Sequence, residues 1–336
     1  MDERSLSAHN DTMRHLHVWS LAALVGVTGI GLALNAAQEP DLRPSGKGIG
    51  TLDHPPMPDQ ASTPKGQAGP PSKNTSNGIN YRGGPVMTNP IKMYYIWYGN
   101  WSNNTATDIL PFLANNIGGT PYFNINSTYY NGSGTKVSTN VTLAGNGLTS
   151  PLATMVSNYP FGNSLSDAQI QQVVLNAISS GVFGGATTPD PNGIYFVLTS
   201  QDVTASSGFC TSYCGWHTYT TVNNTAIKYS FVGDATRCLS ACAAQSTSPN
   251  GNPGADAMAS VIAHELEEAA TDPQLNAWYD NRGYENADKC AWTFGTTYTT
   301  SSGVANMKLG VAPNQKDFLI QRNWVNASGG YCSLTY

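Results

Sequence analysis

The chain has 336 residues, with 16 lysine and arginine residues against 21 aspartate and glutamate residues, and a formal net charge of −5. Charged side chains make up only 11% of the sequence and form no basic cluster, which argues against nucleic-acid binding. Its polarity comes mainly from Gly, Ser, Thr, Asn and Tyr, a composition that agrees with an exported protein.

The N-terminal region carries the pattern of an export signal. Residues 18–34 form an apolar run that follows Arg4 and Arg14, so residues 1–37 are predicted to be a signal peptide or an uncleaved N-terminal anchor. Residues 38–79 are rich in Pro, Gly and Ser without apolar periodicity, which predicts a disordered linker or pro-segment. Either way the rest of the chain is expected to be secreted, possessing no other membrane contact.

Six cysteines lie between residues 210 and 332. In an exported chain an even number of cysteines predicts disulfides rather than metal ligands. We expect Cys290 and Cys332 to form one bridge, which ties the C-terminus to the loop after an acidic helix. The other four form two pairs, Cys210 with Cys214 and Cys238 with Cys242, and each pair is separated by three residues. Each pair either closes a small loop or is cross-linked to the other pair.

Residues 80–336 predict one domain of the α/β or α+β class, with a single mixed sheet. Strands are expected where β-branched and aromatic residues run together before turn residues, at residues 91–99, 193–200 and 226–234. Helices are expected at residues 105–119, at 164–184 with Ser164 or Ser166 as the cap, and at 255–273, with a meandering β region at 121–146.

The last predicted helix contains the acidic stretch AHELEEAATDP, residues 263–273. Asp256 is expected to cap its N-terminus, and Pro273 to end it. With each residue turned about 100° from the last, Glu267 points into solvent. The other acidic side chains fall on or beside the apolar face, so the helix is expected to bury ionisable groups.

His264, Glu265 and Glu268 form an HExxE motif on that buried side. His264 and Glu268 are four residues apart and converge on one point, and a buried unpaired carboxylate is strongly unfavourable. A divalent cation is the simplest compensation, with Glu265 as general base on the water that the cation activates. The alternative is a solvated helix face that matches the motif by chance.

The third ligand must be a carboxylate, a water or His217, because the other histidines fall in the leader and linker: His9, His15, His17 and His54. Glu285 is favoured, since it follows Glu268 by 17 residues. This separation in sequence is close to that at which a return helix delivers a ligand in glutamate-type zincins. Asp288 is the alternate ligand, or it orients His264 by a hydrogen bond. Asp272 is the other candidate for orienting His264. His217 is also a candidate oxyanion donor.

Two resemblances extend this reading. The stretch HELEEAATD is similar to HELTHAVTD of thermolysin-like proteases, whose third ligand is such a glutamate, and this implies a zincin-like domain. Segments from Tyr81 to Cys332, among them YRGGPVMTNPIKMYYIWYGNW, GFCTSYCGWH and YSFVGDATRC, resemble the phosphate-induced protein family, known in plants as EXORDIUM-like proteins. That resemblance implies an extracellular or cell-wall-associated protein. The plant members, linked to growth and brassinosteroid response, do not keep the HExxE motif that this chain and non-plant relatives carry.

The sequence favours a secreted zinc metallopeptidase that acts on a peptide or on a cell-wall or other extracellular polymer. We expect it to be a monomer. Two carboxylate ligands would also admit Mn²⁺ or Ca²⁺. The alternative is a non-catalytic extracellular protein with a structural metal site, in which aromatic residues such as those of YYIWYGNW bind carbohydrate. Ordinary packing is the favoured explanation of those aromatic residues.

Overall fold

Aromatic and β-branched residues form the centre of a five-stranded sheet in the computed structural model, which describes residues 78–147 and 158–336. The predicted leader, and the predicted linker as far as residue 77, lie outside the described residues. The strands, in spatial order, are β3 (Val141–Asn146), β2 (Ile91–Tyr98), β5 (Gly193–Thr199), β8 (Thr225–Gly233) and β7 (Gly215–Val222).

The sheet is mixed, as predicted. β2 is parallel to both β3 and β5, β5 is parallel to β8, and β7 is the antiparallel edge strand. β7 and β8 form a hairpin whose two turn residues, Asn223 and Asn224, both have positive φ, at 48° and 62°. Asparagine tolerates this backbone better than most residues, and a two-residue turn of this kind matches the twist of the paired strands.

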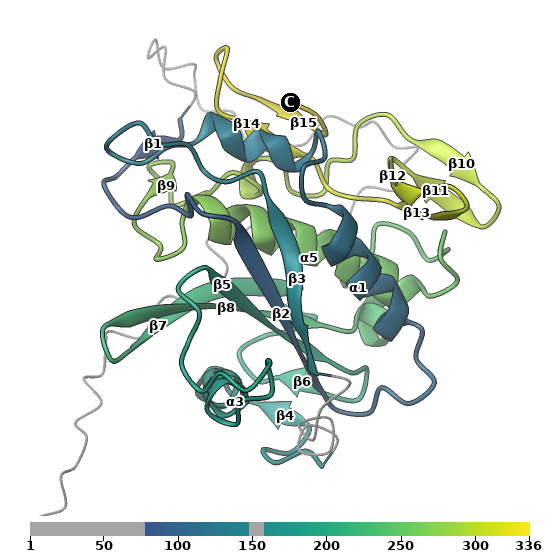
Figure 1. The fold of residues 1–336 in the computed structure, drawn as a ribbon. Helices are drawn as coiled ribbons and strands as arrows, with labels where there is room; N and C mark the ends of the chain where they lie inside the picture. The colour runs from purple at the N-terminus through teal and green to yellow at the C-terminus, as the bar shows by residue number, and fades with distance from the viewer. Residues whose placement is uncertain (1–77, 148–157) are drawn as a thin grey trace, which may run out of the picture. The chain divides into compact units, whose positions relative to one another are not determined.

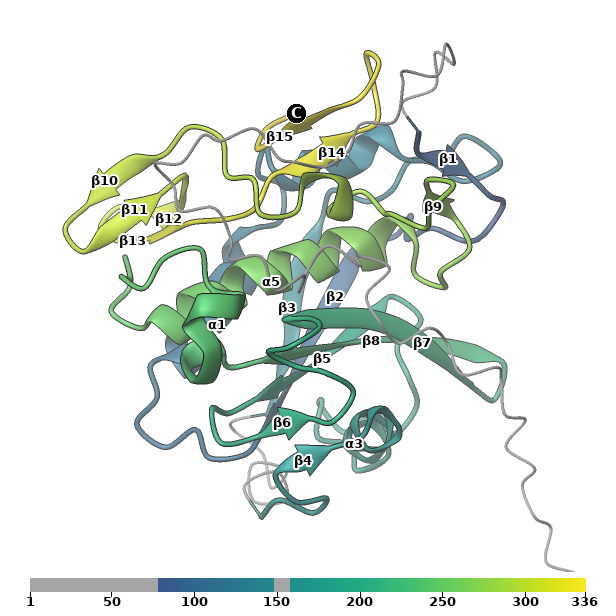
Figure 2. The ribbon, with the colours of Figure 1, turned by 180° about the vertical axis from the view of Figure 1, so that it is seen from behind.

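Helices cover both faces of the sheet (Figures 1 and 2). α1 (Ala106–Asn116) and α5 (Pro253–Thr271) pack together on one face, and α3 (Asp167–Ser179) lies on the other. Ser166 rather than Ser164 caps α3, in a reciprocal capping box with Gln169. This arrangement confirms a mixed α/β domain.

Short elements complete the domain. The region 121–146, predicted to be a β meander, contains a 3-10 helix before the parallel strand β3. The remaining strands pair in two-stranded sheets: β1 (Asn80–Tyr81) with β9 (Trp278–Tyr279), β4 (Ser164–Leu165) with β6 (Thr204–Ala205), β10 (Tyr298–Thr300) with β11 (Gly303–Ala305), β12 (Met307–Val311) with β13 (Asn314–Phe318), and β14 (Asn323–Val325) with β15 (Tyr331–Ser333). The short helices are η1 (Phe123–Thr128), η3 (Ala235–Cys238), α4 (Leu239–Cys242) and η4 (Asp288–Cys290).

Helix α5 is buried on all sides, from Gly254 to Thr271. The sheet lies on one side of the helix, and the C-terminal strands lie on the other (Figure 2). The prediction that Glu267 faces solvent is therefore wrong: this side chain is 0% exposed, and its Oε2 accepts a hydrogen bond from Asn323 Nδ2 at 2.7 Å. Helical periodicity could not reveal a second layer of protein supplied by a distant segment.

The N-terminal cap of α5 also differs from the prediction. Asn252, not Asp256, accepts a hydrogen bond from the backbone N–H of Ala255, and Pro253 occupies the first helical turn. Asp256 lies within that turn and binds the preceding loop, where its carboxylate accepts from Asn250 Nδ2 at 2.6 Å and from the hydroxyl of Ser248. Its role is thus to fix the entry of the chain into α5.

Three disulfides cross-link the domain, and the predicted Cys290–Cys332 bridge is confirmed. The two segments of equal spacing cross-link to each other, through Cys210–Cys238 and Cys214–Cys242. Within the described residues, no helix has both the length and the apolar character that a bilayer-spanning segment requires.

The aromatic residues of the first strand belong to the core. Tyr95, Trp97 and Tyr98 of β2 are at most 4% exposed, and Trp101 just after the strand is 8% exposed. Trp97 and Trp101 make an edge-on contact with ring centroids 4.9 Å apart. These buried rings support packing rather than carbohydrate stacking at this strand.

A buried lysine gives the fold a testable pH dependence. Lys228 of β8 is 5% exposed and donates to the carbonyl of Pro191 at 2.5 Å. Burial lowers the pKa of Lys228 from 10.5 to about 8, although the charge of Asp190 opposes the shift. Between these two values the unfolded chain holds a proton that the folded chain has lost, so the free energy of unfolding should increase with pH.

We expect this free energy to rise by about 1.5 kcal/mol between pH 8 and pH 9.5, relative to a Lys228→Met variant. Urea denaturation of both proteins at several pH values measures the difference. Comparison with the variant cancels the other titrating groups. Parallel pH profiles would show that Lys228 keeps its ordinary pKa.

Candidate metal centre

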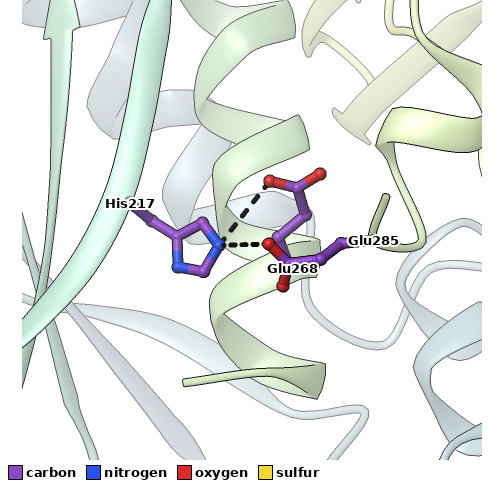
Figure 3. Close-up of side chains that lie close together, drawn as sticks. All are labelled: His217, Glu268 and Glu285. Carbon is purple, nitrogen blue, oxygen red and sulfur yellow. Dashed lines mark hydrogen bonds and ion pairs between the residues drawn. The ribbon is translucent and has the colours of Figure 1, made fainter. Parts of the chain in front are cut away.

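Three parts of the fold bring imidazole and carboxylate groups together in the interior. His217 comes from edge strand β7, and His264, Glu265 and Glu268 come from α5. The loop after β9 and the start of η4 supply two further carboxylates, Glu285 and Asp288. Figure 3 shows His217, Glu268 and Glu285 converging from the strand, the helix and the loop.

The first group of candidate donors contains the histidine and the last glutamate of the HExxE motif. His264 Nε2 lies 3.0 Å from Glu268 Oε1, as expected for residues four apart on a helix, and 3.4 Å from Asp288 Oδ1. We call His264, Glu268 and Asp288 the helix triad. Their donor atoms lie within 4.8 Å of one another, which is close enough for one ion to bind all three.

A second group shares one residue with the first. His217 Nε2 lies 3.1 Å from Glu285 Oε2 and 3.7 Å from Glu268 Oε2. We call His217, Glu268 and Glu285 the strand triad, whose donor atoms also lie within 4.8 Å of one another. Glu268 therefore presents one carboxylate oxygen to each triad.

Backbone hydrogen bonds hold the loop carboxylates against the helix. The N–H of Asp288 donates to Glu268 Oε1 at 3.1 Å, and the N–H of Glu285 donates to Asp288 Oδ2 at 3.0 Å. At the end of α5, Asp272 accepts from the backbone of Asn276 and Ala277, each at 2.6 Å. These contacts fix both ends of the segment 276–288 to the C-terminal half of α5.

Burial strongly disfavours ionisation of the carboxylates. It raises the pKa of Glu265 and of Glu285 well above the ordinary value, and the neighbouring charge of Glu268 adds to both shifts. The pKa of Glu268 is also raised, first by burial and then by Asp288. Burial raises the pKa of Asp272 to about 7, although its backbone hydrogen bonds oppose this.

The two imidazoles respond in opposite ways. Burial lowers the pKa of His217 to about 4, and the charge of Glu268 only partly compensates. Burial also acts to lower the pKa of His264, but Glu268 and Asp288 outweigh it and raise that pKa well above the ordinary value. His217 is therefore neutral near pH 7, which is the form that binds metals.

The residues fit a divalent cation. Among the described residues, no lysine or arginine forms an ion pair with a carboxylate of either triad. Both oxygens of Glu265 and Oε2 of Glu268 are buried without a hydrogen-bond partner in the described part of the chain. Carboxylate and imidazole groups are the ligands of zinc and manganese, and a cation would offset the desolvation of these groups.

The structure brings together all the residues predicted for the site, in an unexpected grouping. Asp288 contacts His264, whereas the favoured third ligand, Glu285, lies against His217. Glu285 comes from an irregular loop that precedes a three-residue 3-10 helix rather than from a return helix. Asp272 lies beside Glu285 at the end of α5, and not beside His264; burial raises the pKa of Asp272, and its contact with Glu285 offsets only part of that rise.

The sequence named His217 only as one of several possible third ligands and as an oxyanion donor, and did not predict its place against Glu285 and Glu268. Strand β7 was not predicted, although the two asparagines at positions 223 and 224 are a recognisable hairpin signal before β8. Gly215, two residues before His217, allows β7 to approach α5 closely. A Cβ there would lie 2.5 Å from Val261 and 3.2 Å from Glu265 Oε1.

The fold and the donor cluster define a disulfide-linked domain with a mixed sheet and a buried histidine–carboxylate centre. The conserved region of phosphate-induced protein 1 matches residues 79–316. The chain belongs to this family, as the sequence resemblance predicted.

Curated relatives of the chain include plant proteins. Protein EXORDIUM-like 5 of Arabidopsis thaliana is 32% identical over 247 residues, a match that covers 65% of this chain and 65% of that protein, which is less than two thirds of its length. Protein EXORDIUM-like 3 of the same plant is 32% identical over 243 residues, covering 65% of this chain and 70% of the relative. No solved structure matches the chain, so the zincin-like relationship stays a prediction.

Proposed function

We propose that the protein is a secreted metal-dependent hydrolase, most simply a zinc peptidase, in which Glu265 is the general base. The three disulfides support secretion, since such bonds persist in oxidising compartments. One observation carries the catalytic assignment. Glu265 lies next to His264, is 0% exposed, and has no hydrogen-bond partner for either oxygen among the described residues.

A metal site that only stabilises the fold would not need this additional buried carboxylate. Glu265 belongs to neither triad, yet the charges of Glu268, His264 and Asp288 all act on its pKa. It is also held close to the edge strand, because Gly215 leaves room for its Oε1. A strongly raised pKa and a position beside metal ligands are typical of a group that takes up and releases a proton.

In the proposed reaction the helix triad, His264, Glu268 and Asp288, holds the cation. When bound, a zinc ion acts as a Lewis acid, polarising a carbonyl group and lowering the pKa of water. Glu265 accepts a proton from the attacking water as the new C–O bond forms at the peptide carbonyl. Glu265 then gives that proton to the leaving nitrogen as the C–N bond breaks, so the products are a carboxylate and an amine.

Complete burial of the donors favours a second candidate function, that of a structural metal site in an extracellular protein. His217, His264, Glu268 and Glu285 are all at most 1% exposed. A cavity beside the N-terminal half of α5, lined by Ala257, Ser260 and other residues, contains none of the donors. A peptidase would therefore have to open the protein around Glu265 before a peptide could bind.

Substitution of Glu265 separates the two functions. Glu265→Gln is expected to keep the metal and to reduce the turnover of a fluorogenic peptide library at least about a hundredfold, since general bases contribute rates of this order. Metal content is measured by mass spectrometry, and hydrolysis by fluorescence, on the chain purified with its disulfides. Glu267→Gln is the matched control, because Glu267 is equally buried on α5 but contacts Asn323.

The control variant is expected to retain both metal and activity. If the wild-type protein holds its metal and cleaves no peptide in the library, the structural function is favoured. Equal turnover by wild type and Glu265→Gln would exclude Glu265 as the base.

A further inference from the structure

The reaction proposed above uses the helix triad and leaves neighbouring donors without a role. His217 and Glu285 are buried at 1% and 0% exposure and come from separate parts of the fold. Both face Glu268 Oε2, which lies 3.7 Å from His217 Nε2 and has no hydrogen-bond partner in the described residues (Figure 3). An unpartnered, buried carboxylate oxygen thus points into a second set of donors.

We propose that the strand triad, His217, Glu268 and Glu285, binds a second divalent cation, so that the carboxylate of Glu268 bridges a pair of ions. The inference rests on the proposed function in that it adds an ion to the same centre. It assigns a separate oxygen of Glu268 to each ion: Oε1 to the ion beside His264, and Oε2 to the ion beside His217.

Distances between the donor atoms agree with two sites. Zinc–nitrogen and zinc–oxygen bonds of about 2.0–2.2 Å in tetrahedral geometry separate neighbouring donor atoms by roughly 3.4 Å. The distances within the helix triad are 3.0 and 3.4 Å, and those within the strand triad are 3.1 and 3.7 Å. Both triads can therefore surround an ion with small movements of the side chains.

A single ion cannot serve both triads. No group of mutually close donors in the described part of the chain contains both His217 and His264. The two imidazoles instead lie against different oxygens of Glu268. In hydrolases with two metals the ions lie about 3.5–4 Å apart, a separation that one bridging carboxylate can span.

The charge of the centre leads to the same conclusion. Four carboxylates occupy it, those of Glu265, Glu268, Glu285 and Asp288, and all four residues are at most 7% exposed. One divalent cation would leave about two negative charges buried, whereas two cations would balance all four carboxylates. Asp272, which also lies beside Glu285, is already stabilised by backbone N–H groups.

Manganese binding tests the second site. The full chain, freed of metal and titrated with MnCl₂, is expected to bind about two ions, whose magnetic coupling is visible by electron paramagnetic resonance. His217→Asn and Glu285→Gln should each lower the stoichiometry to about one ion and replace the coupled spectrum with that of isolated Mn²⁺. The two variants lie in different parts of the fold, one on β7 and one in the loop before η4, so the test stands if one of them misfolds. Circular dichroism checks that each variant is folded.

Glu267→Gln, the control, should keep about two coupled ions, because Glu267 lies outside both triads. A wild-type protein that binds one ion without coupling would overturn the second site, as would a His217→Asn variant that still binds two. Hydrolysis by a protein with one ion would leave the proposed function standing without this inference. Two coupled ions in a protein that cleaves no peptide would support the paired centre and refute the peptidase.

Discussion

Removal of bound metal is expected to lower the midpoint of thermal unfolding by roughly 10 °C for each ion. The reason lies in the burial of the centre: without a cation, Glu265, Glu268 and Glu285 are desolvated, and no lysine or arginine in residues 78–147 or 158–336 forms an ion pair with them. An ion present at a thousandfold excess over its dissociation constant contributes about 4 kcal/mol to the folded state. Scanning calorimetry with and without a chelator measures the shift.

Glu268 is the decisive position for this prediction, because it belongs to both triads. Glu268→Gln should abolish the response to chelator. In the presence of chelator this variant should be at least as stable as the wild-type protein, because a neutral amide replaces a buried carboxylate whose pKa is raised by burial. Glu267→Gln should respond to chelator as the wild type does. An unchanged wild-type midpoint after complete removal of metal would contradict the electrostatic role of the cation.

Loss of the Cys290–Cys332 bridge is expected to lower the free energy of unfolding by about 4 kcal/mol and to weaken metal retention. The bridge closes a separation of 42 residues, and its first cysteine ends the short helix η4 that begins at Asp288. Releasing it frees the segment that positions Asp288, a proposed ligand of the helix triad. Urea denaturation and competition with a metal indicator measure the two effects in a Cys290→Ala, Cys332→Ala double variant.

The Cys210–Cys238 bridge provides the control, because it closes a separation of 28 residues and neither cysteine adjoins a donor. Its removal should cost a similar free energy of unfolding without specific weakening of metal retention. If both double variants lose metal equally, the Cys290–Cys332 bridge has only a general stabilising effect.

The elements that the sequence predicted are those with a strong local signal. The runs around Ile91 and Gly193 became strands within one or two residues, because β-branched and aromatic residues pack well in a buried sheet. Strand β7 was missed, because its Thr- and Tyr-rich residues have a weaker pattern and its pairing depends on the asparagine turn at 223–224. The connectivity of the four central cysteines was open for a similar reason: equal spacing permits both local and crossed bridges.

The site shows the same division. The i, i+4 spacing of His264 and Glu268 follows from helical geometry alone, and the structure places their polar atoms 3.0 Å apart. The positions of Glu285 and Asp288 depend on an irregular loop, and residues three apart in such a loop can face either histidine. Sequence distance therefore predicted that both carboxylates lie near the helix, but not which histidine each one contacts.

By itself, the sequence determined that a histidine and several carboxylates share one buried helix, because periodicity fixes which side chains lie on one face. Only the tertiary structure decided that Glu267 is enclosed by the C-terminal strands and that His217 faces Glu268 and Glu285 from the edge of the sheet. Contacts between distant segments depend on how layers pack and how loops close. A local pattern of residues carries little information about either.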